Sequence, residues 1–360
     1  MHFRNTFLST ATALLTLAGS AEALTATQAS MVPGADFVAT LDIKKVNEAP
    51  IVRKRRAADE ANPDRSASGV WLAKAARFET ATGITKDDVI AIAFSCDIDT
   101  ANLEGETPQE RVGGAIGILA IELAKPISIE KLKLALRLEY GSEQHAGVSE
   151  VAIGNGRGLK INASNEGDPD IYLAVAPEGH VLLTSFNVNA LGEAQARLQS
   201  SGGLHEPSEL AALRQTVAKQ TQIQMACVVP AALRDSINAQ IVALQDQAAQ
   251  NPGLAIVAGI VKLFGGIKNL CAGVALAEDA SITVAGDLGD PLAAMNASLL
   301  LDTMVIPMLQ AKLLQTTGGA TPPNLDEMAK VSAQDSTLEI RFKLSEAQIL
   351  DGVATPVAQP

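Results

Sequence analysis

The sequence predicts an α+β fold made of two similar halves, each an antiparallel sheet with helices on one face. The stretches "AIELAKPISIEKLKLAL" (120–136) and "AGDLGDPLAAMNASLLL" (285–301) carry the first observation. Both contain the end of an apolar strand, an acidic residue next to Leu, a Pro and a helix. The second observation is that short turns join the successive strands, which favours antiparallel pairing. Together they predict an internal duplication.

The first half, residues 35–203, is predicted to follow the order β-α-α-β-β-α-β-β with one extra hairpin. Strands are expected where apolar residues alternate or run continuously, and helices where they recur at helical spacing. Pro126 favours a helix start, because its missing N–H would be unpaired there anyway. The expected elements are strands 35–43, 88–96 and 112–123, helices 44–57, 69–82, 126–138 and 188–199, and hairpins around Asn155-Gly156 and Glu178-Gly179.

The second half, residues 204–345, repeats this order with one hairpin fewer. Pro291 takes the place of Pro126 at the start of its helix. The expected elements are helices 208–219, 253–266 and 291–314, a long helix after residue 230, strands 223–230, 268–278 and 281–288, and a closing hairpin. The last residues, 346–360, are expected to form a flexible tail.

The N-terminal residues 1–23 are typical of a signal peptide. Arg4 precedes an uncharged apolar run, and Ala21-Glu22-Ala23 has the small-x-small form that a signal peptidase accepts. The run is shorter than the roughly 18 residues that a membrane span needs. We therefore expect an exported protein of the periplasm, envelope or secreted fraction. Its mature part would begin with an N-terminal tail, 24–34, and would have no transmembrane segment.

The overall charge narrows the classes of partner. A formal net charge of −12 disfavours nucleic acid, because phosphates would be repelled rather than neutralised. Aromatic residues make up 3% of the chain, so a sugar-binding cleft would have few flat surfaces for stacking. A protein or glycoprotein partner is the expectation that remains.

Paired carboxylates are the catalytic candidates. Asp99-Thr100 and Asp335-Ser336 place one Asp-Thr or Asp-Ser pair in each half, which is similar to aspartic peptidases, where two facing carboxylates activate water. The peptidase motif has Gly next, whereas Ala101 and Thr337 follow here. Asp97 is a further candidate. The alternative is that these residues are solvated turn residues.

The sequence contains no metal or cofactor motif. His-x-x-x-His, Cys-x-x-Cys and His-x-Glu groupings are absent, so we expect no metal site and no cofactor. Cys227 and Cys271 are predicted on strands of one half, so a disulfide between them is one hypothesis. Three small buried thiols, with Cys96 as the third, are the other.

The start of the expected mature part resembles a loose class of uncharacterised exported bacterial proteins with a duplicated α+β architecture. Pro33, Asp36, Phe37 and Asp42 carry this resemblance, together with the export signal and the order of elements over 32–345. The resemblance implies a location and a fold, and it supplies no catalytic residues.

We therefore expect an exported envelope or secreted protein that acts as a protein- or glycoprotein-binding module or as a structural module. The alternative is a secreted acid hydrolase that acts on extracellular proteins or glycoproteins through Asp99 and Asp335. Asp97 would be its spare carboxylate.

The basic cluster of Arg53, Lys54, Arg55 and Arg56 is the candidate site for an acidic partner, because arginine forks bind acidic groups with two hydrogen bonds. Its alternative is a solvated helix end. Replacing all four residues with Ala is expected to weaken retention of an acidic glycoprotein and to flatten the salt dependence of that retention. Pull-down across a salt series measures both, and unchanged retention at every salt concentration would contradict the prediction.

Overall fold

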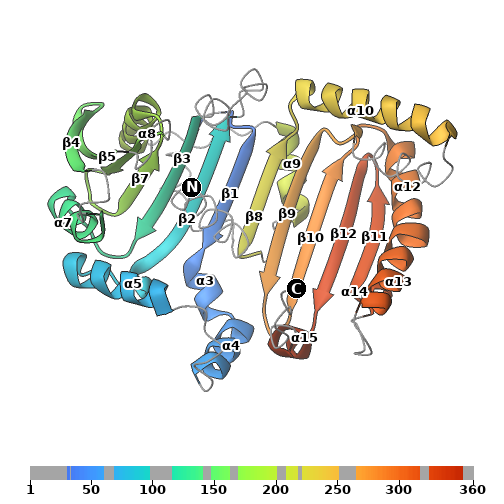
Figure 1. The fold of residues 1–360 in the computed structure, drawn as a ribbon, viewed down its shortest axis with the longest axis horizontal. Helices are drawn as coiled ribbons and strands as arrows, with labels where there is room; N and C mark the ends of the chain where they lie inside the picture. Colours follow the sequence, from blue (N-terminus) through green and yellow to red (C-terminus); the bar gives the residue numbers. More distant parts are fainter. Residues whose placement is uncertain are drawn as a thin grey trace. The chain divides into compact units, whose positions relative to one another are not determined.

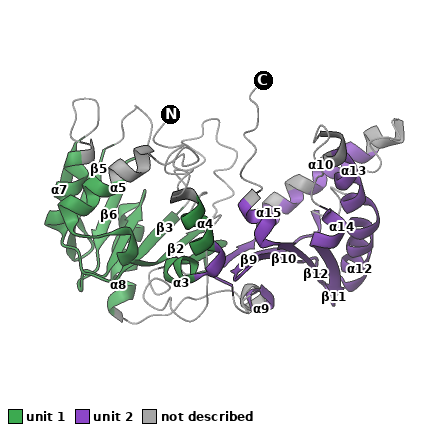
Figure 2. Cartoon of the chain, turned by 90° about the horizontal axis from the view of Figure 1, so that it is seen from below, with its two compact units in different colours: residues 1–48, 52–207 green, residues 49–51, 208–360 purple. Residues whose placement is uncertain are grey.

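The computed structural model divides the chain into two compact units (Figures 1 and 2). Unit 1 comprises residues 1–48 and 52–207, and unit 2 comprises residues 49–51 and 208–360. The structure describes residues 31–32, 34–60, 69–97, 116–140, 147–162, 169–200, 208–217, 221–250, 265–316 and 324–351.

Unit 1 contains an antiparallel sheet in the order β1-β2-β3-β7-β6-β5-β4. Consecutive strands pair with one another, except that β3 pairs with β7 across the intervening helix and the three strands β4, β5 and β6. The strands are β1 (Phe37–Asp42), β2 (Val89–Asp97), β3 (Ile116–Leu123), β4 (Val148–Ile153), β5 (Gly156–Ile161), β6 (Ile171–Val175) and β7 (Val181–Ser185).

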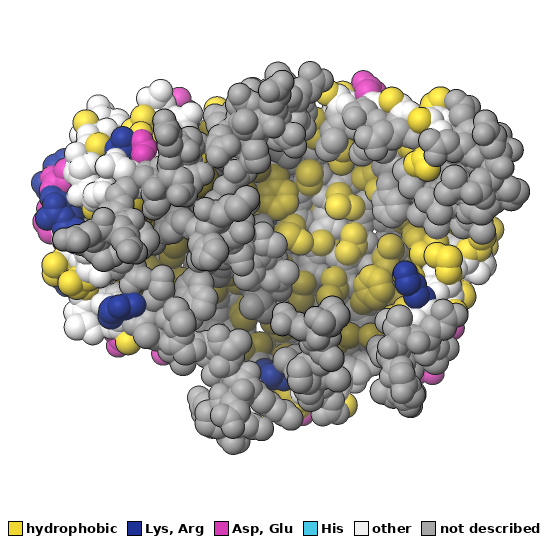
Figure 3. Space-filling view, in the orientation of Figure 1, with side chains coloured by type: hydrophobic (Ala, Val, Ile, Leu, Met, Phe, Trp, Pro, Cys, Tyr) yellow, Lys and Arg dark blue, Asp and Glu magenta, His cyan; other side chains and the backbone are white. Residues whose placement is uncertain are grey.

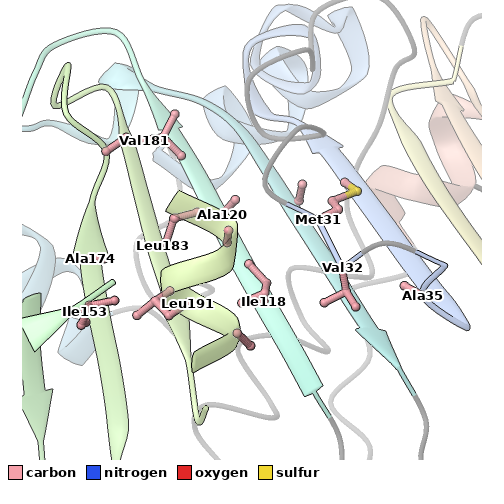
Figure 4. Close-up of a cluster of buried hydrophobic side chains, with 14 of the residues drawn as sticks. Met31, Val32, Ala35, Ile118, Ala120, Ile153, Ala174, Val181, Leu183 and Leu191 are labelled. Atoms are coloured by element: carbon pink, nitrogen blue, oxygen red, sulfur yellow. The ribbon is translucent and has the colours of Figure 1, made fainter. Parts of the chain in front are cut away.

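Helices cover both faces of this sheet. On one face α8 (Val188–Ser200) buries Leu191 in a cluster with Ile118 and Leu183 (Figure 4). On the other face α5 (Gly69–Thr82) and α7 (Ile129–Tyr140) close a second cluster, which includes Leu132 and Leu159. The predicted α+β class with antiparallel pairing is confirmed. The helices lie on two faces rather than one, because strands such as β7 are buried along their whole length.

Unit 2 contains an antiparallel sheet in the order β8-β9-β10-β12-β11. Its strands are β8 (Ile223–Val228), β9 (Asn269–Leu276), β10 (Ala280–Asp287), β11 (Ala329–Gln334) and β12 (Thr337–Leu344). Its helices are α9 (Ser208–Val217), α10 (Ala231–Gln250), α12 (Pro291–Leu300), the π-helical turn η4 (Leu301–Val305), α13 (Ile306–Thr316), α14 (Leu325–Met328) and α15 (Glu346–Asp351).

The two units share a strand order. β8-β9-β10-β12-β11 in unit 2 corresponds position by position to β1-β2-β3-β7-β6 in unit 1, and the β4–β5 hairpin is the addition. The stretches around Pro126 and Pro291 follow corresponding strands, β3 and β10. This agreement supports the predicted duplication, which stays a prediction.

Several predicted boundaries differ from the structure. Pro50 divides the expected helix 44–57 into α3 (Ile43–Glu48) and α4 (Pro50–Glu60), since the ring restricts the preceding residue to extended backbone. Pro126 precedes α7 by a short loop rather than starting it. A 3₁₀ turn, η2 (Lys86–Asp88), leads into β2.

The predicted tails are also shorter than expected. Met31 and Val32, assigned to the tail 24–34, are buried in unit 1, and the Val32 N–H donates to Ser95 Oγ at 2.8 Å. Residues 346–351 of the predicted C-terminal tail form α15. The predicted signal peptide, 1–23, lies outside the described residues.

Gly158 of β5 occupies a position with no room for a side chain. A Cβ atom there would lie 2.5 Å from the Leu173 carbonyl oxygen and would collide with the Ile153 side chain. Gly158→Ala is therefore expected to lower the stability of unit 1 by about 1–3 kcal/mol, the usual cost of overpacking. Thermal unfolding followed by circular dichroism measures this.

Gly147→Ala is the matched control, because nothing lies within 4 Å of a Cβ atom at Gly147. A Gly158→Ala protein as stable as the Gly147→Ala protein would show that the β5 strand relaxes freely.

Candidate functional site

The basic cluster lies on α4. Arg53, Lys54 and Arg56 are exposed, whereas Arg55 is half-buried. The Arg56 guanidinium donates a hydrogen bond to the Asn47 side chain. This exposed arrangement fits both a solvated helix end and a contact with an acidic partner, so the ligand-binding role stays a prediction.

Of the candidate carboxylates, the structure describes Asp97 in unit 1 and Asp335 in unit 2. Asp97 is exposed at the end of β2 in unit 1, and Asp99 lies outside the described residues. Asp335 forms the turn between β11 and β12 in unit 2, with a φ of 50°. Asp is one of the few residues that adopt this left-handed conformation readily, so the turn alone accounts for Asp335. The hydrolase hypothesis therefore stays untested.

Cys227 and Cys271 are not joined by a disulfide in this structure, which was one of the two hypotheses for them. Cys271 lies opposite Ala226 in the sheet, and Cys227 lies opposite Leu270. Neighbouring residues of a strand point to opposite faces, so the two thiols lie on different sides of the sheet. Cys271 is buried under α9, where its Sγ contacts the Leu213 carbonyl oxygen at 3.1 Å.

Metal ligands are not clustered in the part of the chain that the structure describes. No group of three His, Cys, Asp or Glu side chains there could hold a metal ion. His180 Nδ1 lies 2.9 Å from the Leu123 carbonyl oxygen, a contact that joins β3 to the β6–β7 turn. His145 and His205 lie outside the described residues.

Unit 1 has a pocket of about 710 Å³ between the start of α7, the β4–β5 and β6–β7 turns, and α8. Its most prominent cation, Arg157, lies 3.0 Å from Glu130 and 3.8 Å from Glu150. A hydrogen bond from Lys133 and its positive charge hold the pKa of Glu150 below its usual value. Because Arg157 is already paired with carboxylates, its charge alone does not mark the pocket as a site for an anion, and Lys131 is the other cation of the lining.

The sheet of unit 2 presents the clearest candidate site, which we call the apolar face. It consists of three cross-strand rows that each take one residue from β8, β9, β10, β12 and β11 in turn. The rows are Ile223-Val274-Ile282-Phe342-Ala329, Met225-Ala272-Val284-Ile340-Val331 and Cys227-Leu270-Gly286-Leu338-Ala333. None of these positions carries a charged or amide side chain. Figure 3 shows hydrophobic side chains gathered over β9, β10 and β12.

The opposite face of the same sheet is mixed and partly polar. There Leu213 and Val217 of α9 pack on Ala226, Cys271 and Ala285. Beyond α9, β12 and β11 direct Glu339, Arg341, Lys343, Lys330, Ser332 and Gln334 to this side. The register therefore gives the sheet one face that is partly covered by α9 and otherwise exposed to water, and one face that is apolar throughout.

The apolar face is incompletely buried. Its central side chains, including Val284 and Ile340, are half-buried, and Leu270 is 38% exposed. Among the described helices, α12 contacts β11 and β12 at one edge. Ala329 and Val331, the less exposed residues of β11, belong to the apolar face, so α12 lies on this side. An apolar surface of this extent that is open at its centre is typical of a binding site.

The helix that begins at Pro291 is itself unusual. Residues Pro291–Lys312 form the one described helix that is long and apolar enough to cross a membrane, judged by length and composition alone. It packs against the sheet of unit 2 and is therefore part of the folded unit.

No family model and no curated protein match the chain. Among solved structures, the "Structure of crystal form I of TP0453" aligns over 91% of this chain and 95% of that chain, with 10% sequence identity and a TM-score of 0.39. A similarity at this level supports no conclusion about function.

Sequence reasoning missed the apolar face, although part of its signal is visible. β12 alternates Leu338, Ile340 and Phe342 with Glu339 and Arg341, the pattern of a strand with one polar side. The register that aligns five strands was not predictable from this pattern alone. Without it, the apolar residues of β8, β9 and β10 look like ordinary core.

Glu122 of β3 is a half-buried acidic group in unit 1. Its Oε2 atom has no hydrogen-bond partner. Burial and the nearby negative charge of Asp42 raise the pKa of Glu122, and His180 opposes them. A raised pKa means that the folded state prefers the protonated acid. Its ionisation therefore costs stability, and this cost grows as the pH rises through the folded-state pKa.

Glu122→Gln is expected to raise the melting temperature at pH 8 and to change it little at pH 4. At pH 4 the Glu122 side chain is protonated in both the folded and the unfolded protein, so Gln replaces a neutral group. Thermal unfolding at a series of pH values measures the difference. The exposed Glu193→Gln serves as the control for the change from Glu to Gln. An equal gain at both pH values would contradict the raised pKa.

Proposed function

We propose that this chain is an exported envelope protein that acts by binding, and that its ligand is the hydrocarbon part of a lipid, held on the apolar face of unit 2. The observation that carries this proposal is the register of β8-β9-β10-β12-β11, which gives three adjacent rows without a charged or amide side chain.

The chemistry of the apolar face favours hydrocarbon over other ligands. Aliphatic side chains, with Phe342 as the aromatic member, offer no strong hydrogen-bond donor or acceptor to a ligand. A sugar or a peptide buried there would leave its own polar groups without partners, which costs free energy for each group. An acyl chain has no such polar groups, so moving it from water onto the apolar face leaves no hydrogen bond unsatisfied.

The apolar face is large enough to bind an acyl chain. Four spacings of about 4.8 Å separate its outer strands, so it is roughly 19 Å across. Covering about 300 Å² of apolar surface would contribute roughly 7 kcal/mol before the cost of ordering the chain is subtracted. That gain supports reversible binding of a single acyl chain.

Two earlier expectations remain separate proposals. A protein or glycoprotein partner would use the basic cluster on α4, which is tested by its Ala variants. An acid hydrolase would use Asp99 and Asp335, and loss of cleavage in an Asp99→Asn, Asp335→Asn protein would test it. The export signal expected at residues 1–23 agrees with a role at the envelope, where lipids are abundant.

The lipid proposal is tested by two neighbouring substitutions on β12. Ile340→Asp places a charge on the apolar face, whereas Arg341→Asp places the same charge on the opposite, exposed face. A fatty acid with a fluorescent label is expected to bind the wild-type and Arg341→Asp proteins alike. Its affinity for the Ile340→Asp protein is expected to fall at least tenfold, which a fluorescence titration measures.

Circular dichroism spectra and melting temperatures establish that both variants are folded. The conservative Val284→Thr variant is a second probe, because it adds one hydroxyl to the apolar face without a charge. Equal affinity of all four proteins for the fatty acid would refute binding on the apolar face.

A further inference from the structure

The helix at the edge of unit 2 has an inner and an outer side of different character. α12, η4 and α13 follow one another without interruption beside β11 (Figure 1). On the inner side, Ala294 and Ala297 are fully buried and Ile306 nearly so. Small alanine side chains let this helix lie close against β11 and β12.

The outer side carries the large apolar residues, an arrangement opposite to that of a soluble surface helix. Its members are between 41% and 63% exposed, which is high for leucine and methionine. We call these residues the outer stripe: Leu292, Met295, Leu299, Met304, Met308 and Leu309.

The π-helical turn keeps the outer stripe aligned. Leu292, Met295 and Leu299 are three and four residues apart, as on one side of an α-helix. Leu299 and Met304 are five residues apart, and the π turn that begins at Leu301, in which the Ile306 N–H donates to the Leu301 carbonyl, overlaps this stretch. The wider turn absorbs the extra residue. Met304 and Met308 therefore continue the line of the leucines.

The segment is almost free of charge. From Pro291 to Lys312 the charged residues are Asp302 and the terminal Lys312 itself. At about 1.5 Å per residue the helix is roughly 33 Å long. Since its inner side is fixed to the sheet, this helix fits a position parallel to a membrane surface, with the outer stripe among the acyl chains.

A second copy of the chain fits the outer stripe less well. Stable dimers use about 20–30 residues on each side of the interface. The outer stripe has six described members on one helix. Methionine and leucine side chains without polar neighbours adapt to fluid hydrocarbon as readily as to a fixed partner.

We propose that the outer stripe of α12, η4 and α13 inserts into the interface of a lipid bilayer and docks the chain on the membrane. This inference extends the proposed function by naming the membrane as the lipid source, but it stands on a different surface from the apolar face. Because the chain is acidic, docking depends on apolar contact rather than on attraction to anionic headgroups.

Flotation of the full mature chain with phosphatidylcholine vesicles tests the proposal. We expect the wild-type protein to float with the vesicles in both low and high salt. The double variant Leu292→Gln, Leu299→Gln is expected to lose at least tenfold in membrane partition, and Met304→Gln, Met308→Gln to lose a similar amount.

Leu134→Gln, Leu138→Gln on α7 is the matched control. These leucines are 52% and 59% exposed, comparable to the outer stripe, but they lie on a helix of unit 1. The control is expected to float like the wild-type protein. Equal flotation of the control and the outer-stripe variants would overturn the proposal.

Two further results would also be decisive. A wild-type dimer in analytical ultracentrifugation that the Leu292→Gln, Leu299→Gln variant dissociates would assign the outer stripe to a second copy and overturn membrane docking. The Ile340→Asp protein separates the two proposals, because it should lose fatty acid binding and still float. Flotation that fails while fatty acid binding persists would overturn the docking proposal alone.

Discussion

Antiparallel pairing in unit 2 fixes which side chains share a face, and the properties of the unit depend on this constraint. Because β9, β10 and β12 pair without a bulge over their length, alternate residues stay in register across all three strands. A shift of one residue in β12 would bring Glu339 or Arg341 opposite Val284, depending on its direction. The apolar face, the placement of Cys227 and Cys271 on opposite faces of the sheet and the position of α12 all follow from this register.

The two units share one strand order, but helices cover the corresponding sheet face to different extents. In unit 1, α5 and α7 fill the face that contains Ile121, so that face becomes core. The stretches around the two prolines place Gly286 of unit 2 where Ile121 stands in unit 1. Gly286 belongs to the apolar face, which α12 contacts at the β11–β12 edge. The same framework thus gives a closed core in one unit and an open apolar surface in the other.

The sequence predicted most of the elements because their signals are local. The alternation in β12 and the helix after Pro291 each depend on a residue pattern that lies within a dozen consecutive residues. Whether Cys227 and Cys271 share a face of the sheet could not be predicted, because this depends on register, which no single segment encodes. The outer stripe was missed for a related reason: the apolar spacing of residues 292–308 predicts a helix, but burial decides which side faces solvent. Asp335 was read as a catalytic candidate, although its backbone conformation accounts for it.

The π turn of η4 also bears on how the chain tolerates changes in length. A π turn is one residue longer than the α-helical turn that it replaces, so deleting a residue between Leu301 and Val305 would restore a regular helix. Residues on both sides of the deletion would keep their faces, because the π turn already absorbs one extra residue. A second deletion would instead rotate every later residue by about 100° around the helix axis, so Ile306 would leave the sheet and Met308 would turn away from the leucines. This segment should therefore tolerate the loss of one residue but not of two, which its composition does not reveal.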